Sequence, residues 1–329
     1  MRFGLFLPHV GVFGGVRRYL ELGNAWRRMG HEVTLFHPDG TPPGWLEFHG
    51  ATAPLATARG MASEVAICGD PHTYGAFREH RADLHLYYCV LLRDPGLARA
   101  IADREVLLAA NSTALRSWVA RRGRRPVLDG VGGIDADRFR PDPARRAESP
   151  VRILVNGRRS RPKKGTDLIL AALRGLPRDP DFEVVLFDTQ GPGSTEDPRT
   201  GVALPEFARY ILGPTQQELV ALYQSAHVFI AAERKAGWCN TALEAMACGC
   251  AVACTSSGTE DFARDGETAV RIPFRHPFFV RRAAARLLRD RTLRARLSAA
   301  GPAEARRWNW NDLALKLVAQ LERPRGPGA

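Results

Sequence analysis

Short apolar runs alternate with helical patterns in two successive series, and this alternation limits the possible folds more than any other feature of the chain. The first series of runs lies at 2–7, 32–36, 64–68, 84–90 and 106–110, and the second lies at 151–155, 183–187, 227–231 and 250–254. Strands that alternate with helices form parallel sheets. A length of 329 residues suits two such domains. The sequence therefore predicts an α/β protein with two doubly wound domains.

The helical patterns and one proline-rich segment predict where the domains begin and end. Tyr19, Leu22, Trp26 and Met29 recur at spacings of three and four, which indicates one helical face before Gly30. Further helices are predicted at 166–175, 215–225, 240–248 and 309–322. The segment 140–150 is rich in proline and charge, so it is interpreted as an interdomain linker. These features predict domains at 1–145 and 146–308, followed by a helix that crosses back to the first domain and a flexible tail within 309–329.

Charge and cysteine content narrow the class of protein. The net charge of +12 is compatible with three partners, which are nucleic acid, an anionic membrane surface and a phosphorylated small molecule, or with a coding bias that favours arginine. No zinc-finger spacing or basic zipper supports nucleic acid. No apolar run has the ~18 residues of a transmembrane helix, and the first residues are interpreted as a strand rather than a signal peptide. We therefore expect a cytoplasmic protein whose six cysteines are reduced core thiols.

Glycines and basic residues follow several of the predicted strands. Gly14 and Gly15 begin the first helix, where backbone N–H groups and the helix dipole favour an anion. A basic cluster follows the strand at 151–155 and suits a diphosphate; it contains Arg158, Arg159, Arg161, Lys163 and Lys164. After the strand at 227–231, the predicted helix presents the N–H groups of Asn240, Thr241 and Ala242, with Glu244 one turn further in. A glutamate on an otherwise apolar helix is costly unless it has a partner.

Four stretches of the chain together resemble glycosyltransferase family 4. They are "GGVRRYLELGNAWRRMGHEVTLF", "GGIDADRFRPD", "NGRRSRPKKGTDLILAAL" and "GWCNTALEAMACGCAVACTSSGTEDFARDGETA". The resemblance implies the GT-B architecture, with two Rossmann-like domains facing across a cleft. It also implies a retaining transferase that moves a hexose from a nucleotide diphosphate sugar to a hydroxyl acceptor, with no metal and no cofactor. The acceptor is expected to be a glycan, a lipid-linked sugar or a small molecule.

The resemblance assigns roles to individual positions. Arg158 and Lys164 match the basic pair that neutralises the phosphates, with Arg159 as a substitute for Arg158. Glu244 matches the glutamate that holds the ribose, and Asn240 and Thr241 offer backbone N–H groups to the phosphates. The remaining donor positions are Gly14 and Gly15 at the diphosphate, and Ile211 to Gly213 at the nucleobase.

The chain departs from the family pattern at two catalytic positions. The leading glutamate of the family's E-x7-E motif falls on Ala236, and Glu233 lies three residues earlier. We expect Glu233 to take this role across an insertion in the turn; the alternative is that the role is lost. The acceptor-side histidine is also missing, because the fourth strand ends in Cys89. His72 is the preferred substitute and His9 the second.

A basic stretch in the first domain predicts contact with a membrane. Residues 116–126 place Trp118 and Val119 among five arginines, and this composition is typical of peripheral binding to the inner face of an anionic membrane. The alternative is a solvated helix end.

Three other functions remain open. One is a GT-B relative with different chemistry, such as a sugar phosphorylase or a nucleotide-sugar epimerase. Another is a degenerate nucleotide-sugar-binding protein, because of Ala236 and the missing histidine. Nucleic-acid binding is the least favoured of the three.

Overall fold

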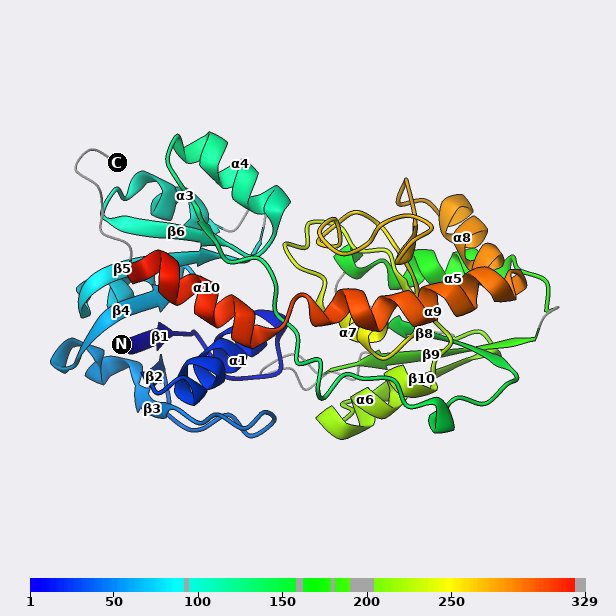
Figure 1. Ribbon diagram of the computed structural model, residues 1–329, viewed down its shortest axis with the longest axis horizontal. Coiled ribbons are helices and arrows are strands. Elements are labelled where there is room, and N and C mark those ends of the chain that lie inside the picture. The colour runs from blue at the N-terminus through cyan, green and yellow to red at the C-terminus, as the bar shows by residue number, and fades with distance from the viewer. Residues whose placement is uncertain (92–94, 158–161, 179–180, 190–203, 323–329) are drawn as a thin grey trace. The chain divides into compact units, whose positions relative to one another are not determined.

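The chain forms two compact α/β units. The computed structural model describes residues 1–91, 95–157, 162–178, 181–189 and 204–322. The N-terminal unit contains Met1–Gly133 and the chain from Trp308 onward, and the C-terminal unit contains Ile134–Arg307. Each unit is built on one parallel sheet with its own core (Figure 1).

The sheet of the N-terminal unit has the order β3-β2-β1-β4-β5-β6-β7, and all pairs are parallel. Its strands are β1 (Arg2–Phe6), β2 (Glu32–His37), β3 (Ala51–Pro54), β4 (Ala62–Cys68), β5 (Arg81–Cys89), β6 (Val106–Ala110) and β7 (Leu128–Asp129). Its helices are α1 (Gly14–Arg28), α2 (Tyr74–Glu79), α3 (Pro95–Ala102), α4 (Thr113–Gly123) and α10 (Trp310–Glu322). Because side chains alternate along a strand, the sheet buries two apolar faces. One packs against α1 and α10, and the other against α2, α3 and α4.

The helix α10 completes the core of the N-terminal unit although it is far from it in sequence. Trp310, Leu313 and Leu317 are buried in the same cluster as the strands β1 and β2. The indole Nε1 of Trp26 donates to the carbonyl of Ala314 at 3.3 Å, and the Trp26 ring stacks on Phe3 at 4.2 Å. The helix α10 is therefore part of the first unit's core.

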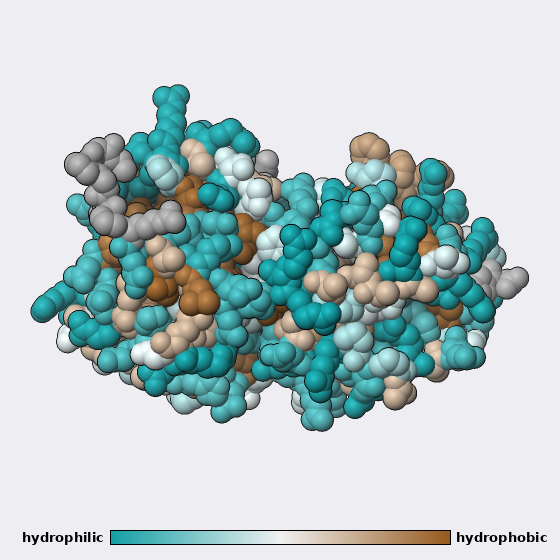
Figure 2. Space-filling view, viewed as in Figure 1, coloured by the Kyte–Doolittle hydropathy of each residue, from teal (hydrophilic) through white to brown (hydrophobic). Residues whose placement is uncertain are grey.

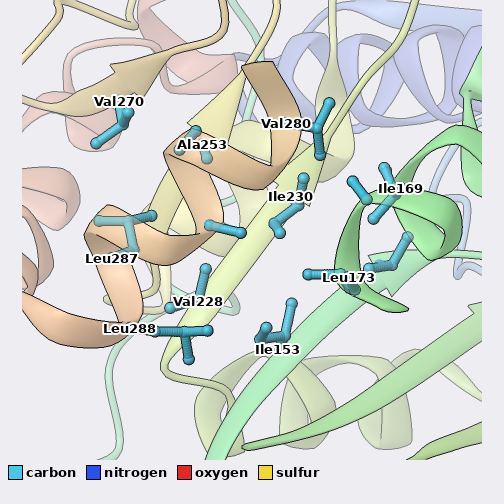
Figure 3. Close-up of a cluster of buried hydrophobic side chains, with 14 of the residues drawn as sticks. Ile153, Ile169, Leu173, Val228, Ile230, Ala253, Val270, Val280, Leu287 and Leu288 are labelled. Carbon is cyan, nitrogen blue, oxygen red and sulfur yellow. The ribbon is translucent and has the colours of Figure 1, made fainter. Parts of the chain in front are cut away.

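The sheet of the C-terminal unit has the order β10-β9-β8-β11-β12-β13, and it is also wholly parallel. Its strands are β8 (Val151–Asn156), β9 (Phe182–Asp188), β10 (Ala208–Leu212), β11 (Val228–Ala231), β12 (Ala251–Cys254) and β13 (Ala269–Arg271). Its helices are α5 (Thr166–Arg174), α6 (Gln216–Ser225), α7 (Asn240–Ala247), α8 (Pro277–Arg289) and α9 (Arg291–Arg306). Figure 3 shows Ile153, Val228 and Ile230 of the central strands packed against Leu173 of α5 and Leu287 of α8.

The structure confirms two α/β units with parallel sheets, but four strands have no counterpart in the predicted series. β3, β7, β10 and β13 are the edge strands of their sheets. None of them has the longer continuous apolar run that marks a central strand buried on both faces. Their positions came from the tertiary structure alone.

The boundary between the units also differs from the predicted one. It lies after Gly133, rather than within the proline-rich segment 140–150. That segment packs on the C-terminal unit, because Gln224 donates to the carbonyl of Arg140 at 2.9 Å. In addition, Arg146 donates to the carbonyls of Cys248 and Gly249 at 3.2 and 3.0 Å. The segment resembles a linker in sequence because it is poor in hydrophobic residues. In the structure, hydrogen bonds that involve backbone carbonyls hold it on the C-terminal unit.

All six cysteines are buried as free thiols, which confirms the prediction for them. Burial raises the pKa of Cys250 to about 12 and that of Cys254 to about 11, since the thiolate loses solvation. These thiols act as small core side chains.

Candidate nucleotide-sugar site

The C-terminal sheet has a topological switch point between β8 and β11. The chain leaves β8 toward β9 on one side of the sheet and leaves β11 toward β12 on the other. The two strands pair in parallel, so their carboxyl ends at Asn156 and Ala231 lie at the same edge of the sheet. In open α/β sheets, ligands bind outside the carboxyl ends of the strands at such a point. The candidate site is therefore formed by the residues that follow these two strands.

Lys164 and Glu233 meet at this switch point. The Lys164 Nζ lies 2.6 Å from the Glu233 Oε1, and the two side chains are only 21% and 8% exposed. The Cys239 thiol lies 3.6 Å from the same oxygen. A charge pair with this little water around it is stronger than a surface pair. The structure thus brings together two of the predicted catalytic residues, which lie 69 positions apart in the sequence.

Gly165 allows the Lys164 segment to approach β11 closely. A Cβ atom at Gly165 would lie 2.5 Å from the carbonyl oxygen of Ala232, and the glycine has a φ of +78°. Only glycine adopts this conformation without strain and fits this space. The close contact explains why "KKG" precedes the helix α5.

Arg275 is a site residue that the sequence interpretation missed. Its Nε donates to the carbonyl of Ala232 at 2.8 Å, so the guanidinium group lies directly beside Gly165. Burial lowers the pKa of Arg275, and the positive charge of Arg234 lowers it further. Arg275 follows β13, so the rule that site residues follow strands would have identified it if that short strand had been recognised.

The backbone of the turn from Glu233 to Cys239 is held by residues that follow β12. The Thr255 hydroxyl donates to the Glu233 carbonyl at 2.7 Å. The Ala236 amide donates to the Ser257 Oγ at 2.8 Å, and the Cys239 amide to the Gly258 carbonyl at 2.8 Å. Ala236, the position of the missing family glutamate, is therefore part of a fixed turn, and the carboxylate beside Lys164 belongs to Glu233.

The helix α7 begins at Asn240, directly after this turn. Its N-cap Cys239 makes no side-chain capping bond, and Asn240 and Thr241 occupy the first two helical positions. The Ala242 amide was predicted to be free for a ligand. It instead donates to the Cys239 carbonyl at 3.2 Å. The helix start lies at the carboxyl edge of the sheet, where the dipole favours an anion.

Glu244 is buried, and its carboxylate accepts a hydrogen bond from a tyrosine. The Tyr223 hydroxyl of α6 donates to the Glu244 Oε2 at 2.9 Å, and Glu244 is 6% exposed. The tyrosine gives the buried carboxylate a hydrogen-bond donor, which a glutamate on an apolar helix needs. No feature of the sequence marked Tyr223 as this partner.

The predicted nucleobase segment lies at the end of the edge strand β10. Ile211 pairs with Phe187 of β9, and Gly213 follows the strand with a φ of +65°. The Gly213 amide donates to the Asp188 carbonyl at 2.7 Å, and the space where a Cβ atom would lie is open. This segment is two strands from β8, or roughly 10 Å. Arg158 and Arg159, the other predicted phosphate residues, lie outside the described residues.

The N-terminal sheet has its own switch point, between β1 and β4. Gly14 and Gly15 are the first residues of α1, and the position of a Cβ on Gly15 is open. His9 follows β1; burial lowers its pKa, and the charge of Asp70 opposes this shift. His72 follows β4, is exposed, and its amide donates to the Asp70 Oδ1 at 2.9 Å. Both histidine candidates therefore follow the strands of this switch point.

The described residues contain no group of three or more His, Cys, Asp or Glu side chains that could hold a metal ion. Asp135 and Asp137 have the spacing of a D-x-D motif, but the Asp135 carboxylate pairs with Arg138 at 3.2 Å. In the same described part, no helix is long and apolar enough to cross a membrane.

Comparison with known proteins identifies the family. Residues 137–304, which include the whole candidate site of the C-terminal unit, match the family described as glycosyl transferases group 1. The chain belongs to this family. It is therefore a glycosyltransferase, and the resemblance to glycosyltransferase family 4 is confirmed.

The relatives of this glycosyltransferase include several mannosyltransferases. It is 30% identical over 289 residues to a GDP-mannose-dependent alpha-(1-6)-phosphatidylinositol monomannoside mannosyltransferase of Mycobacterium tuberculosis, covering 82% of this chain and 73% of the relative. It is 25% identical to the phosphatidyl-myo-inositol mannosyltransferase of Mycobacterium leprae, covering 98% and 96% of the two chains.

Solved structures confirm the GT-B fold. Anabaena Alr3699/HepE in complex with UDP and glucose superposes with a TM-score of 0.79 at 13% identity, over 98% of this chain and 100% of that chain. Sucrose-phosphate synthase from Thermosynechococcus elongatus has a TM-score of 0.77 at 16% identity, over 97% and 98%. The glycosyltransferase thus has two Rossmann-like domains of the GT-B type.

Proposed function

We propose that this glycosyltransferase transfers mannose from GDP-mannose to a hydroxyl group of a lipid-linked or glycan acceptor, with retention of configuration and without a metal or other cofactor. The observation that carries the proposal is the Lys164–Glu233 pair at the switch point of the unit that matches the family. GDP-mannose and phosphatidylinositol acceptors are the substrates in the names of the relatives.

The proposed mechanism uses positive charge where negative charge develops. As the sugar leaves, charge builds on the diphosphate, and the Lys164 ammonium and the start of α7 would stabilise it. Glu233 holds the ammonium at 2.6 Å and so keeps it oriented before the donor arrives. Arg158 or Arg159 would add a bidentate contact with the diphosphate, and Gly14 and Gly15 would offer it backbone N–H groups. Glu244 would contact the ribose. For retention, we propose that the departing phosphate takes the proton of the acceptor hydroxyl, with His72 or His9 beside the acceptor.

Nucleotide binding is the first test of this proposal. GDP and GDP-mannose at saturating concentration should raise Tm by roughly 5 °C or more, because they bind the folded state alone. UDP and TDP should raise it less. If none of these ligands shifted the Tm, the proposal would be contradicted. A protein that binds GDP-mannose but neither hydrolyses it nor forms product with lipid-linked or glycan acceptors would support the degenerate binding protein instead.

Arg275→Ala is expected to lower kcat/KM for GDP-mannose roughly tenfold, mainly through KM. The reason is that the variant loses the bond to the Ala232 carbonyl and releases the turn that carries Glu233. The rate of GDP release from GDP-mannose measures the effect. Arg275→Lys should recover little, since an ammonium group cannot reproduce the guanidinium geometry. Arg209→Ala, which removes an exposed arginine of the same unit, is the control. An unchanged KM in Arg275→Ala would show that this contact has no positioning role.

We also propose that the protein contacts an anionic membrane. The predicted stretch 116–126 contributes charge alone, because Val119 is buried and Trp118 packs against the core of the N-terminal unit. Arg121, Arg122 and Arg124 remain exposed. The basic charge of this stretch favours anionic lipid, but Trp118 and Val119 are held by the core and do not project toward a bilayer.

A further inference from the structure

The turn between β13 and α8 exposes two aromatic side chains. Phe274 is 65% exposed and Phe278 is 50% exposed, and they are the two most exposed aromatic side chains of this turn. Their neighbour Phe279 packs against the core and holds both rings, at centroid distances of 5.1 and 5.2 Å. Figure 2 shows hydrophobic side chains projecting from the surface beside α8. Because Phe279 alone fills the core, the fold does not need the other two rings.

The exposed face of α8 adds positive charge to these rings. Phe278, Arg281, Arg282, Arg286 and Arg289 follow one another at helical spacing, opposite the buried Val280, Ala284 and Leu287. All four arginines are exposed, and none has a carboxylate partner within the described residues. The segment 271–289 contains six arginines and no acidic residue. One surface of the C-terminal unit thus combines projecting aromatic rings with unpaired guanidinium groups.

We infer that this surface, formed by Phe274, Phe278 and the four exposed arginines of α8, docks on an anionic lipid bilayer. Aromatic rings partition into the boundary between headgroups and acyl chains, and arginines beside them bind lipid phosphates. A bilayer accounts for both features, since the headgroup boundary accepts the rings and the lipid phosphates accept the guanidinium groups, whereas an acidic protein accounts for the charge alone. The inference rests on the proposed membrane contact and names its surface, but it is independent of the sugar donor.

The docking surface is connected to the candidate site through one residue. Phe274 precedes Arg275, whose guanidinium group donates to the Ala232 carbonyl next to Glu233. The turn that Phe274 would hold at the lipid surface is therefore the same turn that carries Arg275 to the candidate nucleotide-sugar site. This connection suits an enzyme whose acceptor is a lipid.

Vesicle co-sedimentation tests the inference without any turnover. The wild-type protein should bind vesicles that contain phosphatidylglycerol in a salt-sensitive manner, and vesicles of phosphatidylcholine alone weakly. Phe274→Ser and Phe278→Ser should each weaken binding roughly tenfold, and Arg281→Gln and Arg282→Gln each about fivefold. The matched control is Leu315→Ser, which removes an equally exposed hydrophobic side chain on α10 and should bind like wild type.

Several outcomes would overturn the inference. One is that the wild-type protein does not bind vesicles and stays in the supernatant. Another is that the Phe274 and Phe278 variants bind like wild type, and a third is that binding depends only on Arg121, Arg122 and Arg124. Binding to polyglutamate but not to vesicles would identify an acidic protein partner instead. Circular dichroism and the Tm shift with GDP on the same variants show that fold and donor site are intact. A protein that binds vesicles but no nucleotide would contradict the donor proposal and leave this inference standing.

Discussion

Lys164→Ala is expected to lower the rate of GDP release from GDP-mannose by roughly 10²–10³-fold. Removing one preorganised group that stabilises charge in a transition state has an effect of this size. Lys164 meets the structural requirement, because its side chain is four-fifths buried and its ammonium group is oriented by Glu233 at 2.6 Å at the switch point. The initial rate at saturating donor measures the effect. A variant that retains activity within tenfold of wild type would exclude Lys164 from the mechanism.

The same substitution should also destabilise the protein, and a second variant separates the two effects. The Glu233 side chain, which is 8% exposed, would lose its ammonium partner, and this is expected to cost about 3 kcal/mol. In the double variant Lys164→Ala/Glu233→Gln, the carboxylate charge left without its partner is also removed. This double variant should regain most of the Tm that Lys164→Ala loses, but none of the activity. Arg209→Ala is the control for loss of one positive charge. If the double variant recovered activity, the loss in Lys164→Ala would be a folding effect.

Gly165→Ala is expected to destabilise the C-terminal unit by about 3 kcal/mol. The new Cβ atom would lie 2.5 Å from the Ala232 carbonyl oxygen, and alanine would have to adopt a φ of +78°. Both strain and the clash act on the backbone, which cannot move without displacing Lys164 from Glu233. Thermal unfolding measures the lower Tm, and the rate of GDP release should fall with it.

Gly175 offers a matched control at the other end of α5. It is the C-cap residue of the helix and has an ordinary φ of −85°. The nearest atom to an added Cβ is the Nη1 of Arg281 at 3.0 Å, which is the flexible end of a side chain. Gly175→Ala should therefore change stability by less than about 1 kcal/mol. Equal losses in the two variants would show that the close approach of Gly165 to β11 has no special role.

Much of the fold was predictable because central strands bury both of their faces. The apolar runs at 151–155 and 227–231 correspond to β8 and β11, and their order along the chain implied a parallel sheet. Edge strands such as β10 and β13 carry no such pattern, and this is why Arg275 was missed. In the stretch 116–126, the sequence does not show which way Trp118 and Val119 point, and the structure turns Val119 into the core.

The sequence by itself determined the family and the two-unit organisation, and it nominated candidate residues for phosphate binding, because these depend on local patterns and on motifs at fixed separations. The tertiary structure alone decided which of those residues meet. Glu233 lies out of register with the family motif, and only the packing of β11 against Gly165 brings it to Lys164. Tyr223 beside Glu244 and Arg275 at Ala232 likewise come from segments far apart in the sequence. Contacts of this kind depend on how strands are ordered in a sheet, and no local pattern of residues encodes that order directly.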